Sequence, residues 1–215
     1  MQFQAPSKGD PQHVETLLAQ LVKRLKTRDA ALRQQCAKEL YLFVATLSRQ
    51  LSAETYTKVL QQLTPQLYAL LQSTHDSEQL GGLAAIDLLI DCANEDQIIR
   101  FANYLRNFLA QPNTSRTALL AASKALGHLA TANTTNGVSG TLVAAFVDFE
   151  VKRAFEWLQG ERQEAIFSQR RLAACFVLRE LAQSAPTLFH PWGDVWWLKC
   201  CIYAIDIFGA VILVE

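Results

Sequence analysis

The stretch ALLAASKALGHLAT (residues 118–131) decides the fold class, because its pattern recurs in three other parts of the chain. Within it the small residue Ala122 is followed, four and seven positions later, by Leu126 and Leu129. Positions with this spacing lie on one face of an α-helix, and a small residue on that face lets a second helix approach closely. The stretch therefore predicts a buried helix packed tightly against a neighbour.

The same triplet occurs in three further apolar stretches: Cys36, Leu40 and Phe43; Gly82, Ile86 and Leu89; Ala174, Leu178 and Leu181. The central members fall at 40, 86, 126 and 178, so the successive offsets are 46, 40 and 52. The first two offsets match the period of roughly 40–47 residues of HEAT and armadillo helix pairs. The third is lengthened by about the polar loop 131–140. The alternative, a non-repetitive helical bundle, would need four triplets in register by chance.

We therefore predict an all-α, HEAT/armadillo-like α-α superhelix, a solenoid of about four antiparallel helix pairs, followed by an atypical apolar tail. Capping residues and short breaks place eight helices at about 11–26, 29–49, 52–72, 76–93, 94–110, 113–131, 141–159 and 163–183. Asp29, Ser52 and Asn94 are expected N-caps, Asn113 or Thr114 opens the sixth helix, and Pro65 is expected to kink the third.

The chain is expected to divide into a flexible N-terminus (1–10), a HEAT-repeat solenoid (11–189) and a divergent tail (190–215). The tail holds three of the four tryptophans and two of the five cysteines. Its apolar run 200–214 is shorter than the roughly 20 residues that span a bilayer, and Asp206 inside it would cost about 2.5–3.5 kcal/mol. We expect this tail to aggregate or to dock where another repeat would lie, while membrane association through it remains the alternative.

Composition argues against several classes of function. The 20 basic and 20 acidic residues give a formal charge of zero, without the basic stripe of a nucleic-acid-binding protein. The densest basic cluster lies where the first predicted helix ends, and such residues complement the helix dipole: Lys23, Arg24, Lys26 and Arg28. Five cysteines without a CxxC pair, and no apolar leader, favour a cytoplasmic protein. Three of these cysteines are expected to be small buried residues: Cys36, Cys92 and Cys175.

No catalytic, cofactor-binding or metal-binding residue is predicted, and the chain is not expected to be an enzyme. Phosphate-binding loops, nucleophile elbows and kinase catalytic motifs are missing from the sequence, and its four histidines lie more than fifty residues apart. Gly81-Gly82 is interpreted as a site of close helix packing. The carboxylates between 148 and 164 are interpreted as a solvated, ion-paired helix face, with Asp148 pairing Lys152. Two aromatic stripes are assigned to the core: Phe101, Tyr104 and Phe108; Phe146, Phe149, Phe155 and Trp157.

Particular strings add a resemblance. AKELYLFV (37–44), GGLAAIDLLI (81–90), RFANYLRNFL (100–109), VDFEVKRAFEWLQGER (147–162) and RLAACFVLRELAQSAPTLF (171–189) occur in this order. Together they resemble the extreme N-terminal HEAT region of the TOR (target of rapamycin) serine/threonine kinases, over roughly residues 15–189. After Phe189 the sequence departs from the family pattern. The chain thus resembles a fragment, a truncated gene model or a short isoform.

The resemblance implies a protein-binding scaffold in TOR complex assembly and signalling. In that family the solenoid binds companion subunits such as raptor, while phosphorylation belongs to a distant C-terminal kinase domain. It also implies peripheral association with endomembranes. No family catalytic, ATP-binding or rapamycin-binding residue has a counterpart here. An enzyme with an unrecognised site is the remaining alternative, and it would require clustered ionisable groups.

Overall fold

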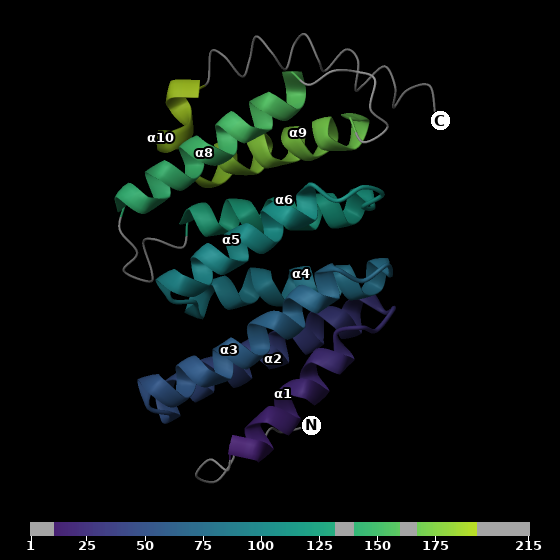
Figure 1. Ribbon diagram of the computed structural model, residues 1–215, viewed down its shortest axis with the longest axis vertical. Helices are drawn as coiled ribbons and strands as arrows, with labels where there is room; N and C mark the ends of the chain where they lie inside the picture. The colour runs from purple at the N-terminus through teal and green to yellow at the C-terminus, as the bar shows by residue number, and fades with distance from the viewer. Residues whose placement is uncertain (1–10, 132–139, 160–166, 193–215) are drawn as a thin grey trace. The chain divides into compact units, whose positions relative to one another are not determined.

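The computed structural model describes residues 11–131, 140–159 and 167–192, and all regular structure within these ranges is helical (Figure 1). The helices are α1 (Pro11–Arg24), α2 (Ala30–Gln50), α3 (Ala53–Leu71), α4 (Asp76–Leu89), α5 (Glu95–Leu109), α6 (Arg116–Thr131), α8 (Gly140–Gln159), α9 (Phe167–Ser184) and α10 (Pro186–Phe189). Two 3₁₀ turns, η1 (Ile90–Cys92) and η2 (His190–Trp192), complete them. The chain forms two compact units, Met1–Cys92 and Ala93–Glu215.

The first unit consists of two helix pairs, α1 with α2 and α3 with α4. The second helices, α2 and α4, pack against each other extensively, whereas α1 and α3 touch much less. The pairs are therefore held together along one side, that of their second helices.

The second unit repeats this arrangement. Its pairs are α5 with α6 and α8 with α9, and again the second helices, α6 and α9, make the most extensive contact between pairs. The short helix α10 packs on both α8 and α9. This repetition within each unit is that of an all-α helical repeat, as the sequence spacing predicts.

The predicted packing face is confirmed residue by residue. All twelve triplet members are buried, and the central ones, at positions 40, 86, 126 and 178, have no exposed surface. They lie on α2, α4, α6 and α9, the second helices of the four pairs. The repeated triplet therefore marks the helices through which successive pairs stack within each unit.

Three of the helix starts are also as predicted. Asp29 Oδ1 accepts hydrogen bonds from the backbone N–H groups of Ala31 (2.8 Å) and Leu32 (3.0 Å). Ser52 Oγ accepts from Thr55 N–H (3.3 Å), and Asn94 forms a reciprocal capping box with Gln97. These side chains satisfy donors that a helix leaves unpaired at its first turn, which defines each start locally.

Other boundaries differ from the prediction. The sixth helix begins at Arg116 and not at Asn113 or Thr114, because Asn113 has a left-handed φ of 60° and Ser115 Oγ caps Ala118 N–H at 3.3 Å. The fourth helix ends at Leu89 and continues only as the turn η1. Neither α10 nor η2 is among the helices predicted from the sequence. The predictions for 1–10 and 193–215, and for the loop 132–139 and the helix start near 163, lie outside the described residues.

The glycine pair of α4 lies in close contact with Leu25, just after α1, and with α3. A Cβ atom added to Gly81 would lie 2.2 Å from the carbonyl oxygen of Leu25, and one on Gly82 would lie 3.0 Å from Leu70 Cβ. The first contact is with backbone, which cannot rotate away as a side chain can. The interpretation of this pair as a packing site thus agrees with the structure.

We expect Gly81→Ala to lower the free energy of unfolding of the first unit by about 1–3 kcal/mol, the usual cost of overpacking. Alanine exceeds glycine in helix propensity by about 1 kcal/mol, which offsets only part of the cost of a clash with backbone. Urea denaturation followed by circular dichroism measures this loss. Gly140→Ala is the matched control, because no described atom lies within 4 Å of its added methyl group. An equal or higher unfolding midpoint for Gly81→Ala would contradict the close approach.

Candidate interaction surface

A groove of about 270 Å³ separates α5 from α8 in the second unit. These are the first helices of their pairs, and they stand apart because the pairs are joined mainly through α6 and α9. The groove is lined almost entirely by apolar side chains from α5 and α8, together with Leu129 of α6: Ile98, Ile99, Ala102, Arg106, Leu129, Leu142, Val143, Ala145, Phe146 and Phe149.

Two large apolar side chains of this lining are open to solvent. Phe149 is 50% exposed and Ile99 is 44% exposed, although both lie on helices whose other faces are buried. This corrects the assignment of the second aromatic stripe to the core: Phe155 is buried, but Phe149 is not, and Phe146 is only partly covered. Single exposed apolar residues are common, but two that share one groove form a patch suited to a partner.

A buried ionic cluster lies beside the groove. Glu150 of α8 has no exposed surface, and its Oε1 accepts a hydrogen bond from Arg106 Nε of α5. Arg153 Nη2 lies 2.5 Å from Glu150 Oε2, a charge contact that lacks hydrogen-bond geometry. Arg106 also donates from Nη1 to Asn103 Oδ1 at 3.1 Å. The cluster therefore ties the middle of α8 to the C-terminal part of α5.

This cluster corrects the interpretation of the carboxylates as a solvated face. Asp148 does pair with the exposed Lys152, at 2.7 Å, and Glu156 is exposed, both as predicted. Glu150, two residues from Asp148, is instead buried, and its carboxylate pairs with the guanidinium groups of Arg106 and Arg153. Glu161 and Glu164 lie outside the described residues.

Aromatic rings surround the two guanidinium groups. Arg106 Cζ lies 4.6 Å from the ring centroid of Phe149 and 5.5 Å from that of Phe146, and Arg153 Cζ lies 4.6 Å from that of Trp157. Both arginines thus interact with negative ring faces. Burial lowers the pKa of Arg153, while the adjacent Glu150 carboxylate acts in the opposite direction. The stacking holds Phe149 at the edge of the groove.

The remaining predicted features are structural. Two members of the basic cluster form ion pairs, Arg24 with Glu39 at 2.5 Å and Lys26 with Glu78 at 3.1 Å. Cys36 is buried as predicted, whereas Cys92 and Cys175 are only partly buried.

Within the described residues no group of three or more potential metal ligands comes together. None of the helices described there has the length and apolar character that crossing a membrane requires.

Cys92 provides a test of local environment in the first unit. Burial, and secondarily the nearby Asp91 carboxylate, raises the pKa of its thiol from 9.0 to about 11. Because only the thiolate reacts, we expect iodoacetamide to label Cys92 at pH 8 about a hundredfold more slowly in the folded chain than in urea. Peptide mapping by mass spectrometry gives the rate at each cysteine. Equal rates in both states would contradict the burial of this thiol.

The structure thus defines an all-α helical repeat with an apolar groove between the first helices of neighbouring pairs. No protein-family model matches the chain. It is 38% identical over 169 residues to the serine/threonine-protein kinase tor1 of Schizosaccharomyces pombe, a match that covers 77% of this chain and 7% of that protein. It is 31% identical over 179 residues to mTor of Drosophila melanogaster (81% and 7%) and 35% identical over 145 residues to TOR of Arabidopsis thaliana (66% and 5%).

The chain is therefore homologous to one segment of the TOR serine/threonine kinases, as its sequence motifs indicate. It spans only about 5–7% of the length of these relatives. This share is consistent with the partial N-terminal segment that the resemblance indicates.

Proposed function

We propose that this chain is an N-terminal HEAT-repeat scaffold segment of a TOR-type kinase, which binds proteins during assembly of a TOR complex. The observation that carries the proposal is the homology to TOR kinases over about four-fifths of the chain. A stack of helix pairs with an open apolar groove supports the same role, because solenoids present extended surfaces to their partners. A companion subunit of the raptor type is the partner that the resemblance implies.

The proposal assigns kinase chemistry to a domain outside the matched segment. The matches to the TOR kinases cover at most 7% of their length, so a separate catalytic domain has ample room. The buried ionic cluster of the second unit supports a structural role for its charged groups, because Glu150 is inaccessible to a substrate. We accordingly propose that the chain acts by binding and not by catalysis, in the cytoplasm.

A competition assay tests this proposal. Purified full-length chain (1–215) is added to immobilised raptor-like companion subunit in the presence of a TOR kinase. We expect the chain to be retained by the subunit and to displace the kinase progressively as its concentration rises. A chain that is folded by circular dichroism, yet neither retained nor competing at tens of micromolar, would refute the scaffold role.

A further inference from the structure

The short segment after α9 lies on the outer side of the α8–α9 pair. Helix α10 packs on both α8 and α9, and Figure 1 shows it on the side of this pair away from α5 and α6. The 3₁₀ turn η2 (His190–Trp192) follows α10 directly. In a stack of helix pairs, this is the side on which the first helix of a further pair would lie.

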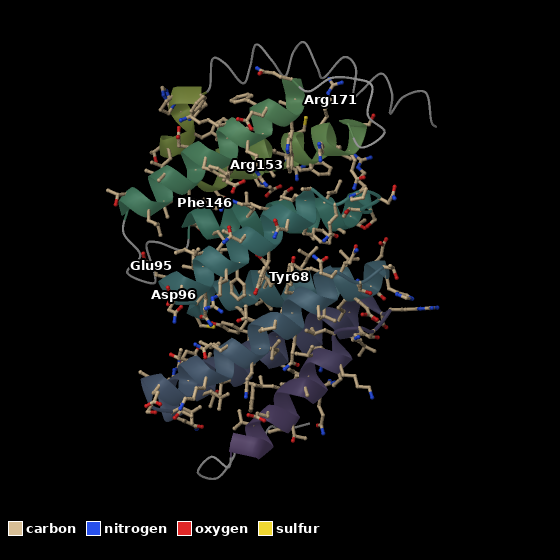
Figure 2. The ribbon with its side chains drawn as sticks, viewed as in Figure 1. Tyr68, Glu95, Asp96, Phe146, Arg153 and Arg171 are labelled. Carbon is tan, nitrogen blue, oxygen red and sulfur yellow. The ribbon has the colours of Figure 1, made fainter. Side chains whose placement is uncertain are left out.

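The outer side of α8 is opposite to its groove side. Phe146 lines the groove next to α5, and at 100° per residue Phe155 lies about 180° around the helix from Phe146. Figure 2 labels Phe146 and Arg153 along the edge of α8 that is turned towards α5, whereas α10 lies beyond the other edge. Phe155 therefore belongs to the outer side of α8, yet only 6% of its surface is exposed.

Trp192 packs on this outer side. Its ring centroid lies 5.9 Å from that of Phe155, with the two rings tilted by 42°. Lys152 Nζ also lies 5.9 Å from the centroid of the Trp192 ring. Both distances are within the ranges of aromatic and cation–π contacts. The indole therefore lies across one turn of α8 on the side that a further helix would occupy.

This contact resembles the one between α5 and α8. There Arg106 of α5 lies over the ring of Phe149, with Cζ 4.6 Å from its centroid. On the outer side of α8, Lys152 lies over the ring of Trp192 in the same way. In both cases a cation of the first helix of a pair meets an aromatic ring of the next element. Trp192 thus takes the place of an aromatic side chain from a further first helix.

Pro191 explains why the chain turns at this point. Helix α10 ends at Phe189, and the backbone N–H of His190 donates to the carbonyl oxygen of Pro186. Pro191 has no N–H to donate to a carbonyl group one turn earlier, so it does not continue an α-helix. The chain instead forms η2, and this turn places Trp192 against α8.

We propose that η2 is a self-capping segment, in which Trp192 covers Phe155 and thereby prevents the α8–α9 pair of a second copy from stacking on the outer side of α8. The end of a helical repeat needs such a cover, because its outer side otherwise exposes the apolar residues through which pairs stack. The inference is independent of the proposed scaffold function. For these three residues it makes specific the expectation that the tail docks where another repeat would lie.

Two substitutions at Trp192 in the full chain test the cap. Trp192→Ala should increase hydrogen–deuterium exchange in residues 151–159 of α8 about fivefold, because the aromatic and cation–π contacts are lost. In sedimentation velocity it should also strengthen self-association at least tenfold relative to the unchanged chain. Trp192→Phe keeps a ring over Phe155 and should alter either quantity by no more than about twofold. Circular dichroism confirms that each variant is folded.

Trp157→Ala is the matched control for self-association. It removes an indole from the same helix, but Trp157 stacks on Arg153, on the groove side of α8. Its self-association should therefore equal that of the unchanged chain. Phe155→Ser added to Trp192→Ala should reverse the stronger association, because it removes the uncovered ring.

Four results would overturn the proposal. Unchanged exchange in Trp192→Ala would show that Trp192 does not cover α8. Faster exchange without stronger self-association would show a packing contact that guards no surface. Equal association of Trp157→Ala and Trp192→Ala, or association that persists after Phe155→Ser, would place the new contact elsewhere. None of these results affects retention by the companion subunit, so the scaffold proposal is tested separately.

Discussion

Glu150→Gln is expected to lower the free energy of unfolding of the second unit by about 3–5 kcal/mol, the usual effect of removing one partner from a buried ion pair. Glu150 has no exposed surface, and Arg106 and Arg153 are only 24% and 13% exposed. Glutamine keeps the shape of the side chain but removes the buried negative charge that the two guanidinium groups share. Urea denaturation monitored by circular dichroism measures the loss.

The neighbouring Asp148 provides the control for this variant. Asp148→Asn removes a carboxylate from the same helix, but its pair with Lys152 is exposed at both ends. Exposed pairs contribute about 0–1 kcal/mol, so this change should shift the midpoint little. Replacing Glu150, Arg106 and Arg153 together by Leu, Met and Met should recover much of the stability, because no unpaired charge remains. Similar losses for Glu150→Gln and Asp148→Asn would show that Glu150 is solvated.

Leu126→Ala is the second change with a large expected effect, a loss of about 2–5 kcal/mol. Leu126 has no exposed surface and is the central member of the triplet in α6, the helix that joins α9 across the stack. Truncation leaves a cavity between two helices whose positions are fixed by their other contacts, so it cannot close fully. Thermal unfolding followed at 222 nm should show a clearly lower midpoint.

Leu32→Ala is the comparison for this variant, because Leu32 is 51% exposed and its replacement should change stability by no more than about 0.5 kcal/mol. Leu178→Ala, at the equivalent position of α9, should behave like Leu126→Ala, since both positions are fully buried. An unchanged midpoint for Leu126→Ala would remove the packing register on which the repeat is based.

Local signals predicted most helix starts. Asp29, Ser52 and Asn94 cap helices through their own side chains, so a few consecutive residues contain the whole interaction. The start at Arg116 was missed because it depends on the left-handed backbone at Asn113, which asparagine tolerates but does not require. The glycine pair was interpreted correctly as a packing site, although its partners, Leu25 and Leu70, could not be named from the sequence.

The interaction surface was not predictable in the same way. The aromatic stripe of α8 has helical spacing throughout, yet Phe155 is buried and Phe149 is half exposed. Likewise Asp148 and Glu150 are both acidic residues of one helix with a basic residue three or four positions on, yet one is solvated and the other fully buried. Nothing in their immediate sequence distinguishes the members of either pair.

The sequence by itself determined the inward face of the second helix of each pair, how many residues separate successive pairs, and which kinase family the chain resembles. Each of these depends on periodicity or identity along the chain. The repeated triplet centred on positions 40, 86, 126 and 178 carries the first two, and strings such as RFANYLRNFL (100–109) carry the third. Only the tertiary structure decided that α5 and α8 stand apart around an apolar groove and that Glu150 lies against Arg106. The reason is that both features depend on where one helix pair settles on the next, which places residues 44 positions apart in contact.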